Sequence, residues 1–148
     1  MTRILVVEDD LALADVLAFT LRRAGFEVDL AHDGRTALAL FLKEKPDLIV
    51  LDWTIPNMDG LEVCTRVRTE SNTPIIMLTV RNADEDVIAA LDAGADEYVT
   101  KPFSLRQLIA RIRSLLRRTI GEPQGMLNAG PLSLDVERRE ARWGDERP

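Results

Sequence analysis

The sequence is poor in cysteine and in basic charge, and each shortage excludes a class of protein. Its 148 residues contain one cysteine, Cys64, which excludes an internal disulfide and a thiolate metal cluster. Acidic residues outnumber basic ones by 25 to 19, which argues against a generally basic surface for nucleic acid. No apolar run reaches the length of a membrane span, and no signal-peptide pattern opens the chain. We expect a cytoplasmic protein without a membrane segment.

Five short apolar runs are present instead, and a helical pattern follows each of them. The runs are residues 4–7, 26–31, 48–51, 75–78 and 98–100. Run 48–51 is too short for a helix and does not alternate, which is typical of a strand buried on both faces. Five strands that alternate with five helices predict an α/β fold with a doubly wound parallel sheet. At this length we expect the flavodoxin-like strand order 2-1-3-4-5.

Side chains that can react or bind a ligand stand at the ends of four predicted strands. Glu8 and Asp9 follow the first strand and Asp52 the third, while Thr79 ends the fourth and Lys101 follows the fifth. Strands one and three are neighbours where the strand order reverses, so the three carboxylates should converge. Such like charges are tolerable only with a proton or a cation between them. Hard oxygen ligands with open positions suit Mg²⁺, which readily recruits phosphate oxygens.

This set is what the formation of an acyl phosphate on Asp52 would need. Mg²⁺ and Lys101 would face the charge that builds up during phosphoryl transfer, and the Thr79 hydroxyl can hydrogen-bond a phosphoryl oxygen. Each residue alone has a simpler interpretation. Asp9 or Asp10 can cap a helix, Thr79 can be an ordinary strand residue, and Lys101 can be a solvated loop charge. The occurrence of the whole set at strand ends, in the right order, favours the chemical interpretation.

An ordered set of motifs resembles the receiver domain of two-component response regulators. The motifs are Glu8-Asp9, Leu51-Asp52, Ile55-Pro56-Asn57-Met58-Asp59-Gly60, Leu78-Thr79, Gly94-Ala95-Asp96-Glu97-Tyr98 and Thr100-Lys101-Pro102-Phe103. The resemblance covers residues 1 to about 118. It implies a phosphoacceptor protein that takes a phosphoryl group from a sensor histidine kinase. Such a protein is not an enzyme in the usual sense, although it catalyses its own phosphoryl transfer and slow autodephosphorylation.

The resemblance also assigns roles to individual positions. It implies that Asp52 is the phosphoacceptor and that Thr79 and Lys101 contact the phosphoryl group. Four positions are implied to bind Mg²⁺: Glu8, Asp9, Asp52 and the main-chain carbonyl of Thr54. Tyr98 resembles the aromatic switch residue, whose ring turns inward when Thr79 moves toward the phosphate. The bond between Lys101 and Pro102 is implied to be cis.

The details most resemble the OmpR/PhoB class, through Leu51-Asp52-Trp53 and a basic last helix. This class implies a homodimer that forms on phosphorylation, through a face made by the fourth helix, the fifth strand and the last helix. Val87 and Gln107 stand where class members usually place a charged pair. The ionic contacts of the face are then left to four residues: Asp92, Glu97, Arg111 and Arg113.

The composition changes after Arg118. Residues 119–130 contain Gly and Pro and are interpreted as a linker. Alternation in residues 131–148 predicts a short C-terminal β segment, which resembles the opening sheet of a winged-helix DNA-binding effector domain. The chain stops before a recognition helix. We therefore expect transcription control by the full-length protein, with DNA bound only through the missing effector domain, whether the chain is trimmed or naturally short.

Three other functions remain as alternatives. A stand-alone receiver, phosphorelay or scaffold protein would carry the same motifs without binding DNA. A haloacid-dehalogenase-like aspartyl-phosphate hydrolase mostly has a second Asp two residues after its nucleophile, where this chain has Thr54. A flavodoxin-like nucleotide or flavin binder needs a phosphate loop rich in Gly, Ser or Thr after the first strand. Glu8-Asp9-Asp10 occupies that place and would repel a phosphate in the absence of a metal.

Overall fold

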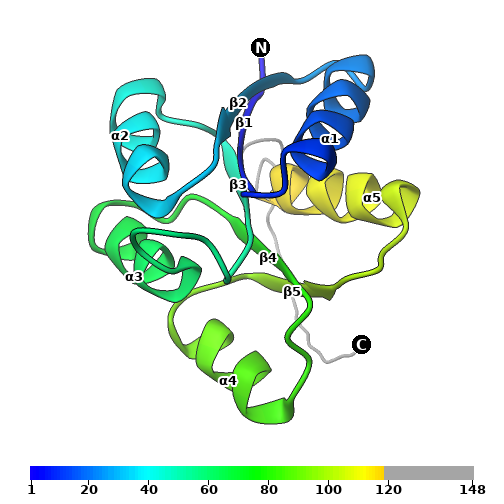
Figure 1. Ribbon diagram of the computed structural model, residues 1–148. Helices are drawn as coiled ribbons and strands as arrows, with labels where there is room; N and C mark the ends of the chain where they lie inside the picture. Colours follow the sequence, from blue (N-terminus) through cyan, green and yellow to red (C-terminus); the bar gives the residue numbers. More distant parts are fainter. Residues whose placement is uncertain (119–148) are drawn as a thin grey trace, which may run out of the picture. The chain divides into compact units, whose positions relative to one another are not determined.

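A computed structural model describes residues 1–118, in which five strands alternate with five helices (Figure 1). The strands are β1 (Arg3–Val7), β2 (Glu27–Ala31), β3 (Leu48–Leu51), β4 (Ile75–Thr79) and β5 (Glu97–Thr100). The helices are α1 (Leu11–Arg23), α2 (Gly34–Glu44), α3 (Gly60–Glu70), α4 (Asp84–Asp92) and α5 (Leu105–Leu116). The predicted linker and C-terminal β segment lie outside the described residues. Residues up to Arg113 form one unit, and a second begins at Ser114.

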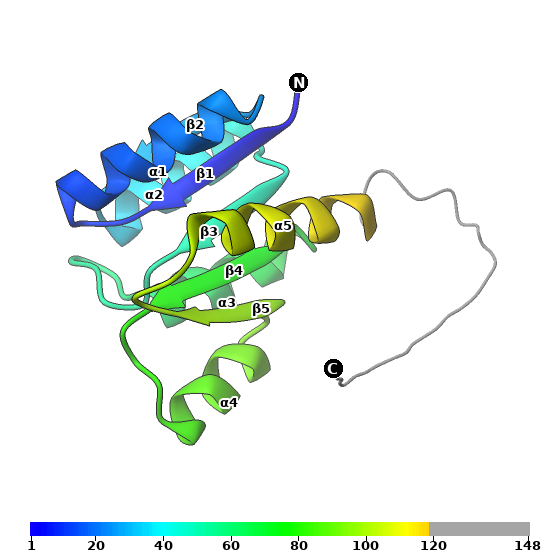
Figure 2. The ribbon, with the colours of Figure 1, turned by 90° about the vertical axis from the view of Figure 1, so that its right-hand side faces the viewer.

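The strands form one parallel sheet in the order β2-β1-β3-β4-β5, as predicted. All residues of β3 and β4 are buried, because helices cover both faces of the sheet at its centre. Helices α1 and α5 lie on one face and α2, α3 and α4 on the other, and Figure 2 shows α1 and α5 in front of the strands. In the register, Val7 pairs with Leu51, so the residues that follow β1 and β3 emerge side by side.

Aspartate side chains cap three helices in this fold. Asp10 accepts from Leu13 N–H in α1, Asp33 from Thr36 N–H in α2 and Asp59 from Glu62 N–H in α3. The sequence allowed either Asp9 or Asp10 to cap the first helix, and the structure shows that Asp10 is the N-cap. Asp9 has no such role in the capping of α1.

Helix α4 begins three residues before its first large apolar residue. It starts at Asp84, and Val87 opens its apolar pattern. The first turn is made of Asp84, Glu85 and Asp86, whose negative charges are favourable at the positive end of a helix dipole. No side-chain hydrogen bond caps this helix at Ala83. The acidic first turn, through its interaction with the helix dipole, therefore stabilises this end of α4 in place of a side-chain cap.

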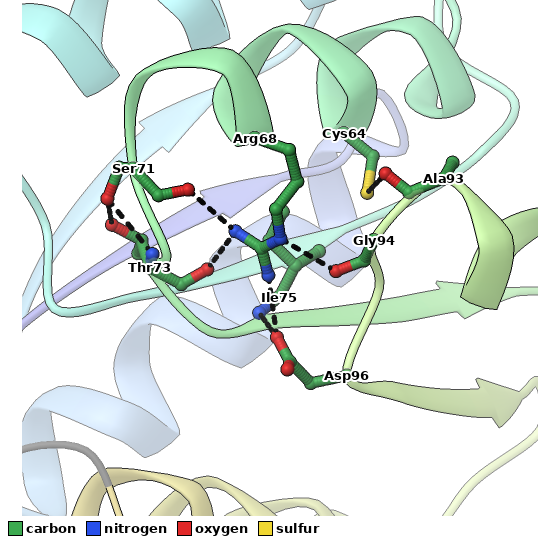
Figure 3. Close-up of polar contacts among 8 residues, drawn as sticks. All are labelled: Cys64, Arg68, Ser71, Thr73, Ile75, Ala93, Gly94 and Asp96. Carbon is green, nitrogen blue, oxygen red and sulfur yellow. Dashed lines mark hydrogen bonds and ion pairs between the residues drawn. The ribbon is translucent and has the colours of Figure 1, made fainter.

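Arg68 ties two loops together at the edge of the sheet where β4 begins (Figure 3). Its guanidinium donates to the carbonyls of Gly94 (3.0 Å), Thr73 (2.6 Å) and Ser71 (3.3 Å) and to Asp96 Oδ2 (2.8 Å). The same Asp96 oxygen accepts from the N–H of Ile75, the first residue of β4. The loop before β4 and the loop before β5 are thus held by a single side chain.

No helix within residues 1–118 combines the length and the apolar character that a membrane crossing requires.

Candidate functional site

Three carboxylates meet where β1 and β3 end. Oxygen atoms of Glu8, Asp9 and Asp52 lie within 4.8 Å of one another. Glu8 and Asp52 are only 2% and 5% exposed, whereas Asp9 is exposed. The backbone holds both buried acids in place, because Glu8 N–H donates to the Ala31 carbonyl and Asp52 N–H to the Val7 carbonyl. The convergence that the strand order predicts is therefore present.

Lys101 lies between the two buried carboxylates. Its Nζ is 2.8 Å from Glu8 Oε1 and 2.9 Å from Asp52 Oδ2. Burial raises the pKa of Glu8 above its ordinary value, and the hydrogen bond from Lys101 offsets only part of this effect. Burial alone would lower the pKa of Lys101, but the hydrogen bonds to both acids outweigh it, and the pKa is raised. The bond from Lys101 to Pro102 is cis, as expected.

The site fits a hard cation. One ammonium group faces two buried carboxylates, with the exposed Asp9 carboxylate beside them, so negative charge is in excess. The side-chain atoms that this cluster offers as metal ligands are all carboxylate oxygens, the ligand type that Mg²⁺ prefers. Thr54 lies at this cluster, since its N–H donates to Asp52 Oδ1 over 3.1 Å. The role of the Thr54 carbonyl in binding Mg²⁺ stays a prediction.

Thr79 and Tyr98 are connected through one residue, Arg81. The Thr79 side chain is fully buried, and its Oγ1 accepts from Arg81 N–H at 3.3 Å. The Tyr98 hydroxyl donates to the Arg81 carbonyl over 2.9 Å. Burial raises the pKa of Tyr98. The two predicted switch residues therefore meet the same segment of the loop between β4 and α4.

Sequence reasoning missed two residues at this edge of the sheet. The guanidinium carbon of Arg81 lies 4.4 Å from the centroid of the Trp53 ring, next to Asp52 in the chain. His32 Nδ1 lies 2.9 Å from the main-chain carbonyl of Glu8. Both residues reach the site from loops, where no periodicity marks a partner. The position of Arg81 two residues after Thr79 is the signal that could have drawn attention to it.

The four residues predicted for the dimer face do not all lie together. Arg111 of α5 pairs with Glu97 of β5 at 2.6 Å, and Asp92 is the last residue of α4. Arg113 instead donates to the Ala24 carbonyl over 3.4 Å, at the end of α1. Side chains two residues apart on an α-helix point about 200° away from each other, so Arg111 and Arg113 lie on different sides of α5. This contact with the end of α1 does not favour the predicted role of Arg113 in the dimer face, and that role stays a prediction.

Residues 4–113 match the family described as the response regulator receiver domain. The chain is 48% identical to the sensory transduction protein RegX3 of Mycolicibacterium smegmatis over 143 residues, which are 93% of this chain and 63% of that protein. It is 44% identical to the DNA-binding dual master transcriptional regulator RpaA of Synechocystis, with 97% of this chain and 63% of that protein covered. The chain thus spans about three fifths of these relatives.

Solved structures are similar as well. The receiver domain of the Francisella response regulator 1452 has a TM-score of 0.77 and 36% identity, over 80% of this chain and 99% of that one. The BeF3-activated N-terminal receiver domain of Klebsiella pneumoniae RstA has a TM-score of 0.76 and 34% identity, over 78% of this chain and 99% of that one.

Proposed function

Because this chain belongs to the family of response regulator receiver domains, we propose that it accepts a phosphoryl group on Asp52. One observation carries the proposal. Asp52 is a buried carboxylate at the end of a central strand, with Lys101 bound to it and with Glu8 and Asp9 oxygens within 4.8 Å. A buried acid with a cationic partner and a place for a second cation is equipped to receive a phosphoryl group.

In the proposed reaction a carboxylate oxygen of Asp52 forms a bond to phosphorus. The bond between phosphorus and the donor atom breaks, and the donor leaves with the electron pair. Lys101 provides a fixed positive charge beside the attacking oxygen, and the Thr79 hydroxyl hydrogen-bonds a phosphoryl oxygen. Glu8, Asp9, Asp52 and the Thr54 carbonyl would hold Mg²⁺, which supplies positive charge against the phosphoryl oxygens. Slow autodephosphorylation would reverse the modification.

A sensor histidine kinase is the proposed donor in the cytoplasm. Two-component relatives support this partner, since RegX3 is named a sensory transduction protein. RpaA is named a DNA-binding transcriptional regulator, and this supports transcription control by the full-length protein. In the proposed domain organisation, residues 1–118 are the receiver domain, residues 119–130 are a linker and residues 131–148 are the start of a winged-helix effector domain. The proposed output is a homodimer that forms on phosphorylation.

Phosphoryl incorporation tests the proposal. The protein is incubated with acetyl phosphate and Mg²⁺, and its intact mass is measured. We expect a gain of one phosphoryl group, which Asp52→Asn and a chelator each abolish. Asp10→Asn is the matched control, because Asp10 caps α1 and asparagine caps a helix equally well. Undiminished incorporation by Asp52→Asn would overturn the proposal.

A further inference from the structure

Arg81 makes contacts in four directions from the loop between β4 and α4. Its N–H donates to Thr79 Oγ1 (3.3 Å), and its carbonyl accepts from the Tyr98 hydroxyl (2.9 Å). Its guanidinium carbon lies 4.4 Å from the centroid of the Trp53 ring, and its Nη1 is 3.4 Å from Asp86 Oδ1. This one residue therefore joins the end of β4, strand β5, the start of α4 and the loop that follows the phosphoacceptor strand.

Trp53 is a fixed support for that guanidinium. Its side chain is only 6% exposed, and its carbonyl accepts from Gly60 N–H at 2.8 Å. Gly60 has no room for a side chain, because a Cβ there would collide with the carbonyl of Asp52 and the Cα of Trp53. The loop after β3 is thus folded tightly on itself. By packing on Trp53, the Arg81 side chain is anchored to a tightly folded segment that begins next to Asp52.

The loop between β4 and α4 has few other restraints. Residues 80–83 are all exposed, and Val80 has 65% of its surface in contact with solvent. The helix that follows has no side-chain cap at Ala83. Segments with few buried contacts open at low cost in free energy. The contacts of Arg81 are therefore the main ties between this loop and the phosphoryl site.

The position of the loop sets the direction of the Thr79 hydroxyl. Thr79 Oγ1 accepts the N–H of Arg81, so the hydroxyl hydrogen must point elsewhere. A phosphoryl oxygen on Asp52 is an acceptor for that hydrogen. A donor whose range of directions is restricted before the anion arrives loses less entropy and needs less rearrangement on binding it.

We propose that Arg81 is a positioning residue: stacked on Trp53, it holds the loop between β4 and α4 so that Thr79 can donate to a phosphoryl oxygen. This inference rests on the proposed function of Asp52. The stack on a buried ring is the main contribution, because a guanidinium binds an aromatic face strongly. The ion pair with Asp86 is secondary, since the Arg81 and Asp86 side chains are 44% and 24% exposed and exposed pairs are weak.

Beryllofluoride binding, an analogue of phosphorylation, tests the inference. The affinity is measured with Mg²⁺ by Trp53 fluorescence in a Trp143→Phe background, which leaves one of the two tryptophans. We expect Arg81→Ala to weaken binding about three- to tenfold and Arg81→Lys, which keeps a cation, to recover part of the loss. Asp86→Asn should change the affinity by less than about twofold.

Arg66→Ala is the matched control, because it removes an exposed arginine that is paired with Glu62 on the surface of α3. A thermal melt of each variant reports whether it is folded. Equal affinity of Arg81→Ala and the parent would overturn the positioning role and leave the role of Asp52 standing. Equal losses in Arg81→Ala and Arg66→Ala would also overturn it, as a general effect of lost charge. Absence of Mg²⁺-dependent binding by the parent would overturn both proposals.

Discussion

Lys101 neutralises two buried carboxylates at once. It lies 2.8 Å from Glu8 and 2.9 Å from Asp52, whose side chains have almost no contact with solvent. Removal of one partner from a buried ionic cluster leaves charges that neither water nor a counterion compensates. The stability of the metal-free protein should therefore depend on this lysine more than on other lysines of the chain.

We predict that Lys101→Met lowers the free energy of unfolding by about 2–4 kcal/mol at neutral pH in the presence of a chelator. Mg²⁺ should restore part of the loss, because a second cation would replace the missing charge. Urea unfolding measures both effects. Lys43→Met, an exposed substitution on α2, is the control and should change stability by less than about 0.5 kcal/mol. A Lys101→Met protein as stable as the parent without metal would contradict this account of the site.

The same substitution has a pH dependence with a definite sign. The raised pKa of Glu8 means that the folded protein binds this proton more tightly than the unfolded chain does. The stability from this group is complete below the ordinary pKa of a glutamate and is lost as the pH rises through the raised value. Loss of Lys101 removes an interaction that lowers this pKa. The destabilisation by Lys101→Met should therefore shrink as the pH falls and Glu8 becomes protonated.

Among the elements, the strands and their order could be predicted from the sequence, because buried parallel strands leave continuous apolar runs and crossovers are right-handed. The family resemblance is confirmed, and the strand order brings Glu8, Asp9 and Asp52 together as predicted. Loop contacts could not be predicted. The stack of Arg81 on Trp53 depends on two loop conformations that no periodicity encodes.

The connection between α3, β4 and β5 gives a second prediction. Arg68→Ala should lower the free energy of unfolding by about 2–3 kcal/mol, because three carbonyls and Asp96 lose a charged donor. Gly94→Ala should also destabilise, since Gly94 has a φ of +114° and an added Cβ would press on the Arg68 side chain. A double-mutant cycle by urea unfolding measures the coupling between the two positions.

In that cycle the double variant should lose less stability than the sum of the single variants, by about 0.5 kcal/mol or more. The alanine at position 68 makes room for the new methyl group, while the unfavourable φ at position 94 remains. Arg66→Ala, an exposed neighbour on α3, should have almost no effect. Strict additivity would show that Arg68 and Gly94 do not contact each other as described.

At the scale of the whole molecule, the proposed output is a dimer through α4, β5 and α5. Ile88 and Leu91 of α4 are 58% and 46% exposed, so this face offers apolar surface. Arg111 and Glu97 add charge beside it, with Arg111 47% exposed. Exposed ion pairs contribute about 0–1 kcal/mol each and are screened by salt. A face that combines a small apolar area with such charges suits a two-fold dimer of modest affinity.

We predict that the beryllofluoride-activated protein dimerises at low salt and dissociates at high salt. Arg111→Glu should weaken the dimer, because the new carboxylate would lie beside the carboxylate of Glu97 and repel it. Arg113→Glu is the matched control and should leave the dimer unchanged, since Arg113 contacts the end of α1. Sedimentation velocity at low and high salt distinguishes these outcomes. A monomer at low salt and high concentration, or equal effects of the two substitutions, would exclude this face as the interface.

The site of phosphorylation is the most direct test of the central claim. Borohydride reduces an aspartyl phosphate to homoserine, which peptide mass spectrometry locates in the sequence. After treatment with acetyl phosphate and Mg²⁺, we predict homoserine at position 52, none at positions 9 or 10, and no 5-hydroxynorvaline, the reduced form of a glutamyl phosphate, at position 8. Reduction at another acid, or an unchanged Asp52 in protein that has gained a phosphoryl group, would contradict the claim that Asp52 is the phosphoacceptor.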